Sequence, residues 1–79
     1  MITGSQLRAA RALLDWTQEE LAAASGVTER TIRSLEDGKS RPFDSTIDRL
    51  RGAVEGAGIT FLETETGIGV LLKLSGDQV

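Results

Sequence analysis

The side chains best suited to hydrogen-bond with nucleic-acid bases lie in one segment, residues 28–41. Arg30 and Arg33 are three residues apart, so a helix would place them on the same side. An arginine guanidinium can donate two hydrogen bonds to O6 and N7 of guanine, which distinguishes guanine from the other bases. The carboxylate of Glu29 has two interpretations: it could accept a hydrogen bond from cytosine N4, or stabilise the positive N-terminus of a helix. The segment therefore predicts that these side chains recognise nucleic-acid bases through hydrogen bonds.

Residues 17–37 predict the two helices that would position these side chains. Thr17 and Glu20 have the spacing of a capping box at the start of the first helix. Gly26 lies where the chain must turn and where a positive φ is needed, and Thr28 can cap the second helix. Two helices crossing at roughly 100° form the motif that places the second helix in the major groove of DNA. The alternative is an ordinary helical hairpin with no nucleic-acid partner.

The composition excludes the commonest catalytic and metal-binding chemistries. The 79 residues include no histidine, so the usual general base and the usual zinc ligand are missing. They include no cysteine, which removes disulfides and thiolate metal sites. Helix caps and surface positions account for the acidic residues. We therefore expect no enzyme activity, no catalytic residue, no metal and no cofactor.

The net charge of −3 argues against binding to DNA through electrostatics alone. Residues 28–41 hold four basic and three acidic residues, whereas residues 42–79 hold three basic and six acidic ones. We expect the acidic C-terminal half to face away from DNA. No apolar run approaches the roughly 20 residues of a membrane span, and the N-terminus lacks a signal-peptide pattern. We therefore expect a cytoplasmic protein that does not bind membranes.

The run TQEELAAASGVTERTIRSLEDGKSRP resembles the helix-turn-helix of the phage repressor and Cro (XRE-like) family of transcriptional regulators. The resemblance covers roughly residues 5–57 and is carried by matching residues at the family's spacing: Gln18, Ala22, Gly26, Ile32, Leu35, Glu36, Gly38, Arg41 and Pro42. It implies a lambda-repressor-like domain of four helices, a recognition helix formed by the second helix of the pair, and a homodimer on an inverted-repeat operator. The C-terminal third departs from the phage repressor pattern, in which a further helix would follow.

The resemblance also implies roles for Gln18, Arg11 and Glu36. Gln18 matches a glutamine that contacts the DNA backbone and steadies the recognition helix. Arg11 matches an arginine that pairs with a glutamate just after the recognition helix, which is Glu36 in this sequence. A buried or half-buried pair would hold the first helix against the recognition helix. The alternative is that Arg11 and Glu36 are both solvated surface charges.

Further residues are suited to contact with the DNA backbone. Thr17 and Thr28 precede helices whose unpaired amide groups favour phosphate. The hydroxyl groups of Thr31 and Ser34 suit bases or phosphates, and we assign Thr31 to the backbone and Ser34 to the bases. We also expect phosphate contacts from the loop after the recognition helix, namely from Lys39, Ser40 and Arg41. Ordinary solvated charge is the alternative for the two cations of this loop.

The rest of the chain predicts two more helices and a β-hairpin. We expect one helix over residues 4–14, capped by Thr3 with Gln6, and another over about residues 46–56, capped by Asp44 or Ser45. The aromatic residues are assigned to the core: Trp16, Phe43 and Phe61. Residues 59–64 and 68–74 have the composition and alternation of strands joined by a turn at 65–67. The predicted fold is a single, mainly α domain over residues 1–79, helical over 1–57 and a hairpin over 58–79.

The hairpin is the predicted element of self-association. A lone two-stranded hairpin is marginally stable in water, and its unpaired edges favour pairing with another chain. We therefore expect two hairpins to form a shared four-stranded sheet, with the apolar residues Ile59, Phe61, Ile68, Val70, Leu72 and Leu74 at the dimer contact. The alternative is a hairpin that packs on its own helices in a monomer.

Together these features predict a sequence-specific DNA-binding transcriptional regulator, in its simplest form a homodimeric repressor. One alternative is an antitoxin-type regulator that also binds a protein toxin through the hairpin or the acidic surface. Another is a protein-interaction module that binds no DNA. Arg30 and Arg33 on the exposed side of the recognition helix argue against this last alternative.

Overall fold

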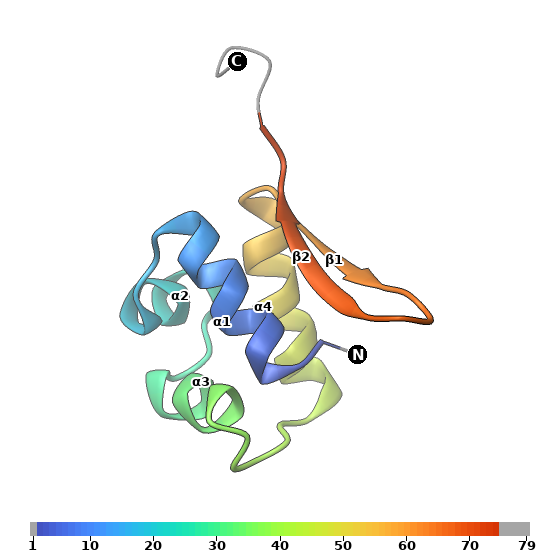
Figure 1. Cartoon of the computed structure of the whole chain (residues 1–79). Helices are drawn as coiled ribbons and strands as arrows, with labels where there is room; N and C mark the ends of the chain where they lie inside the picture. The colour runs from blue at the N-terminus through green and yellow to red at the C-terminus, as the bar shows by residue number, and fades with distance from the viewer. Residues whose placement is uncertain (1, 75–79) are drawn as a thin grey trace.

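The computed structural model describes residues 2–74, which form four helices followed by a β-hairpin (Figure 1). The elements in chain order are α1 (Gly4–Leu14), α2 (Gln18–Ser25), α3 (Glu29–Glu36), α4 (Asp44–Gly56), β1 (Ile59–Glu63) and β2 (Ile68–Leu72). Helices α1 and α4 occupy the middle of the molecule, with α2 and α3 to one side and the hairpin to the other. The predicted fold class is confirmed. No helix of the described part of the chain is long and apolar enough to cross a membrane.

The predicted start signals of the first three helices operate as expected. The Thr3 hydroxyl accepts a hydrogen bond from the Gln6 amide at 3.1 Å, and the Thr17 hydroxyl accepts one from the Glu20 amide at 3.0 Å. In both cases the side chain three residues on returns a bond to the cap, which completes the capping box. Helix α2 ends at Gly26, whose φ of 73° is strained for any residue with a Cβ. These local bonds fix where α1, α2 and α3 begin.

The prediction for the fourth helix is wrong at its N-terminus. Helix α4 begins at Asp44, and its cap is Phe43, without a side-chain capping bond. The Phe43 carbonyl accepts bonds from the amides of Thr46 and Ile47 at 2.9 and 3.1 Å, so the first turn closes on the backbone directly after Pro42. The assignment of Phe43 to the core is also wrong, because this cap residue is 84% exposed.

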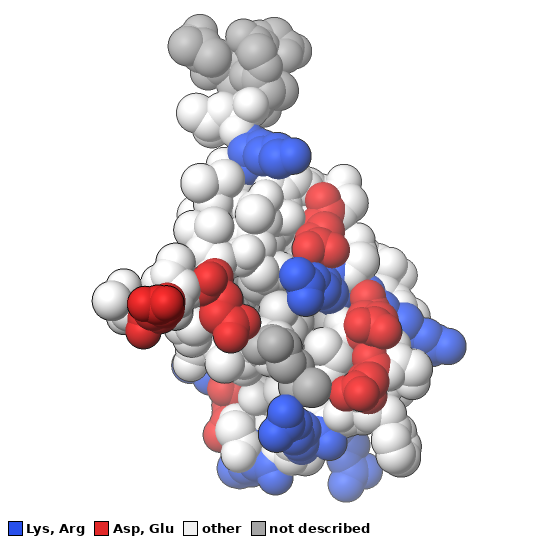
Figure 2. All heavy atoms as spheres, turned by 90° about the vertical axis from the view of Figure 1, so that its right-hand side faces the viewer, with Lys and Arg blue, Asp and Glu red and all other residues white. Residues whose placement is uncertain are grey.

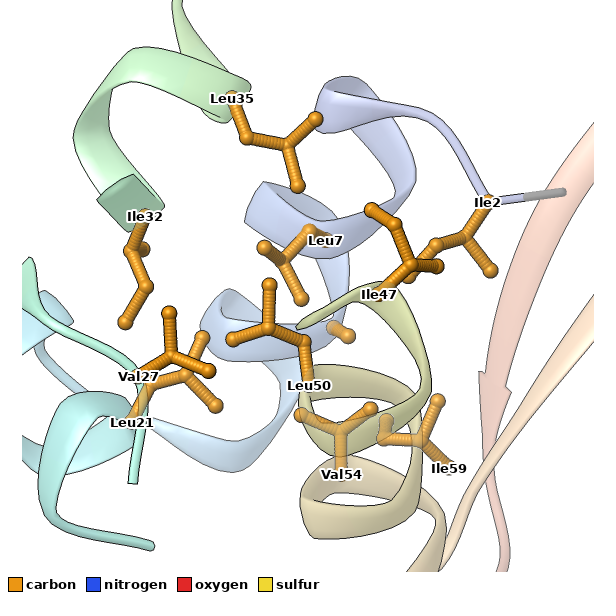
Figure 3. Packing of buried hydrophobic residues seen from close by; sticks show 11 residues of the cluster. Ile2, Leu7, Leu21, Val27, Ile32, Leu35, Ile47, Leu50, Val54 and Ile59 are labelled. Atoms are coloured by element: carbon orange, nitrogen blue, oxygen red, sulfur yellow. The ribbon is translucent and has the colours of Figure 1, made fainter. Parts of the chain in front are cut away.

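The core contains apolar side chains from all four helices and from β1 (Figure 3). Its largest fully buried side chains are Leu7, Leu21, Ile32, Leu50 and Val54. Helix α1 begins directly against the end of α3, because a Cβ on Gly4 would lie 2.1 Å from the Leu35 carbonyl oxygen. Only glycine permits that approach, so Gly4 determines how closely the first helix supports the end of the third.

The hairpin packs on the helices of its own chain. The strands are antiparallel with Phe61 opposite Val70, and both end earlier than predicted, at Glu63 and Leu72. Ile59 is 3% exposed, and Phe61, Val70 and Leu72 pack against the same core. This arrangement corresponds to the alternative of a hairpin on its own helices. These four side chains therefore complete one chain's core instead of forming an open face for a second chain, whereas Ile68 and Leu74 remain exposed.

Gln6 connects the hairpin to α1 in a way that the sequence did not reveal. Its side-chain oxygen accepts a bond from the Thr3 amide at 2.9 Å, as the capping box requires. Its side-chain nitrogen donates to the carbonyl oxygens of Leu62 and Gly69, at 3.2 and 3.1 Å. These two residues face each other across the strands. One buried amide therefore caps α1 and contacts both strands.

We predict that Gln6→Leu lowers the free energy of unfolding by about 1–3 kcal/mol, because three partners lose a hydrogen bond in a buried site. The matched control is Thr3→Ala, which removes the capping hydroxyl but keeps the amide of Gln6. Urea unfolding followed by circular dichroism measures the free energy of unfolding of both variants. Hydrogen exchange of the β1 and β2 amides shows whether the hairpin is the part that is destabilised. Equal losses in the two variants, with unchanged protection of the strand amides, would contradict this role.

Candidate nucleic-acid interface

Helix α3 has one buried and one exposed side. Ile32 and Leu35 face the core, while the predicted base-reading residues Glu29, Arg30 and Arg33 are exposed. Arg33 and Glu29 form an ion pair at 3.5 Å, one helical turn apart. An exposed pair of this kind contributes little stability and can separate at small cost. Both charged ends are therefore available to a ligand on the outer side of α3.

The loop after α3 returns along the exposed side of the helix. The amides of Gly38 and Lys39 donate to the carbonyls of Leu35 and Ser34 at 3.0 and 2.9 Å, and the φ of Gly38 is 72°. These bonds form a Schellman motif, which reverses the chain. The hydroxyl groups of Ser34 and Ser40 are 2.7 Å apart, so the loop contacts the helix through a side-chain hydrogen bond. The structure thus brings the predicted loop residues next to the predicted base-reading helix.

The threonines assigned to the DNA backbone lie at the N-termini of α2 and α3. The Thr28 hydroxyl accepts a bond from the Thr31 amide at 3.2 Å and donates to the Thr31 hydroxyl at 2.9 Å. Thr17 is exposed and caps α2. Their hydroxyl groups are therefore engaged within the helix starts. Phosphate contact at these positions would involve the outward-facing amides of the first helical turns.

Glu36, the last residue of α3, is almost completely buried and is held by two other helices. Its side chain is 1% exposed, and its carboxylate accepts bonds from Arg11 Nε at 2.7 Å and Arg11 Nη2 at 2.6 Å. Gln18 Nε2 donates a third bond, at 3.2 Å. Arg11 and Glu36 thus form the two-pronged pair that suits arginine and carboxylate geometry. The alternative of two solvated charges does not describe this structure.

The pair keeps Arg11 charged. The hydrogen bond to Glu36 raises the pKa of the Arg11 guanidinium above its ordinary value, against the opposing effect of burial, and the Glu36 charge raises it further. A third guanidinium N–H, on Nη1, donates to the Trp16 carbonyl at 2.9 Å. Arg11 therefore connects α1, the start of α2 and the end of α3.

Arg8 belongs to the same cluster, although the sequence analysis did not single it out. Its Nη2 donates to the backbone carbonyl of Glu36 at 2.7 Å and lies 3.7 Å from the Asp37 carboxylate. The available signal was spacing, because Arg8 and Arg11 are three residues apart on a helix whose second arginine already had an expected partner on α3. Two arginines of α1 therefore contact the C-terminal end of the candidate recognition helix.

Several basic side chains gather at one end of the molecule. In Figure 2, lysine and arginine side chains gather at the lower end, where Figure 1 places α3 and the loop after it. Most of the acidic side chains in this view lie above them, together with other basic side chains. The hairpin residues that were predicted for dimerisation lie on the other side of α1, away from α3. The structure thus separates the candidate DNA surface from the candidate dimer element.

Within the described residues, no cluster of histidine, cysteine, aspartate and glutamate could hold a metal ion. The surface at α3 is instead a set of exposed guanidinium, ammonium, hydroxyl and amide donors. Such donors suit phosphates and base edges.

Comparison with known families agrees with this geometry. A family model described as helix-turn-helix matches residues 7–52, which is more than half of the chain and includes all of α2 and α3. A search of curated proteins found no match.

We predict that Arg11→Met lowers the free energy of unfolding by about 3–5 kcal/mol, because it leaves the Glu36 carboxylate buried without its main partner. Arg33→Met is the matched control, since it breaks an exposed pair and should cost less than about 1 kcal/mol. Urea unfolding measures the free energy of unfolding of both variants. Adding Glu36→Leu to Arg11→Met should recover part of the loss, because no charge then remains buried. Equal free energies of unfolding for the two single variants would show that the buried pair contributes no more to stability than the exposed one.

Proposed function

Because the chain belongs to the XRE-type helix-turn-helix family of DNA-binding transcription regulators, we propose that it reads a specific operator as a homodimeric repressor. The observation that carries this proposal is the construction of α3. Its inner side is fixed by Ile32, Leu35 and the buried Glu36, while Arg30 and Arg33 are exposed on the other side. A helix held this firmly can present guanidinium groups to base edges in a constant orientation.

The remaining contacts divide by chemistry. Arg30 and Arg33 suit guanine, and Glu29 and Ser34 complete the proposed base-reading set. Backbone contacts are proposed for Lys39, Ser40 and Arg41 in the loop, for Thr17, Thr28 and Thr31 at the helix starts, and for Gln18. Since Gln18 already donates to Glu36, its contact with DNA would couple phosphate binding to the position of α3. Phosphate contacts set the register of the protein on DNA, and base contacts set its specificity.

Repression follows most simply from occupancy, because a bound dimer excludes polymerase from the same DNA. A two-fold dimer would bind two half-sites about 34 Å apart, one turn of the DNA helix. A second candidate function is an antitoxin-type regulator that also binds a toxin protein. It is favoured by the exposed leucines on the outer side of the hairpin, Leu62 and Leu71.

We predict that selection from random duplex DNA at about 100 mM salt, a concentration that weakens non-specific binding, enriches an inverted repeat. Each half-site should contain at least one guanine that faces Arg30 or Arg33. Circular dichroism on the same sample establishes that the protein is folded. A folded protein that enriches no sequence would refute the proposal and favour a protein partner.

We predict that Arg30→Ala weakens binding to the selected site by about 1–3 kcal/mol and relaxes the base preference at one position of each half-site. Fluorescence anisotropy with the selected duplex and its single-base variants measures both effects. The charge-matched control is Arg51→Ala on α4, because Arg51 lies 5.6 Å from the Phe61 ring, beside the hairpin. If Arg30→Ala weakened all sequences equally, the assignment of Arg30 to base reading would be wrong.

We further predict that Lys39→Ala weakens binding to every sequence by a similar factor and leaves the base preference intact. The slope of log affinity against log salt concentration should fall by about one, since one phosphate contact is lost. A salt titration of the same anisotropy assay measures the slope. An unchanged slope would remove Lys39 from the phosphate-binding set.

A further inference from the structure

Within residues 2–74, the two-stranded sheet leaves one edge of each strand without a strand partner. The ladder bonds from Thr64 to Gly67 and from Lys73 to Gly58 fix which backbone groups point outward. Because paired residues alternate in an antiparallel ladder, residues 60, 62, 69 and 71 bond within the hairpin. The amide and carbonyl groups of Ile68, Val70 and Leu72 therefore point away from β1, along the outer edge of β2.

The edge of β2 carries neither a charged residue nor a proline. Protein edges are usually protected by charged residues, by proline or by a covering element. Residues 68–72 are Ile-Gly-Val-Leu-Leu, with neither a charge nor a proline. By contrast, β1 ends in Glu63 and runs beside α4, whose Arg51 lies over the Phe61 ring. The edge of β2 is therefore the one suited to accept another strand.

Helix α1 packs against β2 and provides a surface beside this edge. Ser5, Ala9 and Leu13 are spaced by four residues and so share one side of α1. Ser5 and Ala9 line a hollow of about 140 Å³ together with Gln6 of α1 and with Ile68, Gly69 and Val70 of β2. Leu13 lines a second hollow with Leu72 and Leu74, and its own side chain is 45% exposed. An added strand would cover this largely apolar surface.

We propose that the added strand is β2 of a second copy, paired antiparallel about a two-fold axis at Val70. Val70 would then face Val70 of the other copy, and Ile68 would face its Leu72, so the uncharged strand is complementary to itself. Charge favours the antiparallel direction. Lys73 after one strand would come beside the turn of the other copy, which carries Glu65. The pairing rests on the homodimer of the proposed function and specifies its interface.

Cysteine cross-linking tests the register, since the chain has no cysteine of its own. Val70→Cys would place two thiols on facing residues with Cα atoms about 5.5 Å apart, within the range for a disulfide. In the control Ile68→Cys, the same pairing separates the two cysteines by four residues, about 13 Å along the strands. We expect a covalent dimer on oxidation of the first variant only. Equal cross-linking of both variants, or of neither, would overturn the proposal.

A second pair of variants tests the edge itself. Ile68→Pro removes an amide that points away from β1, so the hairpin keeps its own ladder. Ile68→Ala keeps that amide and removes only the side chain. Sedimentation equilibrium should show a dimer of the 8.4 kDa chain, with a dissociation constant raised about tenfold or more by proline relative to alanine. A monomeric parent, or equal dissociation constants for the two variants, would overturn the pairing.

The two proposals fail in different ways. A monomer that still enriches a single DNA half-site would overturn the β2 pairing and leave DNA recognition standing. A dimer with the expected cross-link that enriches no DNA sequence would overturn the proposed function and leave the pairing standing.

Discussion

The burial of the Glu36 carboxylate is the constraint on which the arrangement of the helices depends. A carboxylate that is 1% exposed must be paired, since an unpaired charge is very costly away from water. Its partners come from elsewhere: Arg11 on α1 and Gln18 at the start of α2. These bonds therefore hold the three helices together at the end of α3. That arrangement places the other side of α3 in solvent.

Helix α1 connects the two candidate functional parts of the molecule. Through Arg8 and Arg11 it contacts the end of α3, and through Gln6 it contacts both strands of the hairpin. The close approach at Gly4 brings the start of α1 against the end of α3. A change in the position of α1 would therefore also move the candidate recognition helix and the edge of β2. The candidate DNA surface and the candidate dimer edge are therefore both held in place by α1.

The features that could be predicted from the sequence are local ones. Thr3, Thr17 and Thr28 cap helices through bonds that span three residues, and Gly26 supplies a positive φ within its own turn. The start of α4 was misplaced because the rule for capping residues favoured Asp44 or Ser45, whereas the backbone of Phe43 closes the first turn. The bonds from Gln6 to the hairpin and those from Arg8 to the end of α3 were missed, because these partners lie far along the chain. The ion pair of Arg11 was anticipated only through the family resemblance, since spacing alone left a solvated alternative.

The long sequence separation between Gln6 and its strand partners affects the order in which the contacts of α1 form. Its two strand partners lie 56 and 63 residues further along the chain. During synthesis, α1 leaves the ribosome well before those partners exist, so for that time its hairpin-facing side contacts water. The cost of closing so long a loop must also be met before the amide is bonded. The contacts of α1, which supports the candidate recognition helix, are thus complete only after β2 has been synthesised.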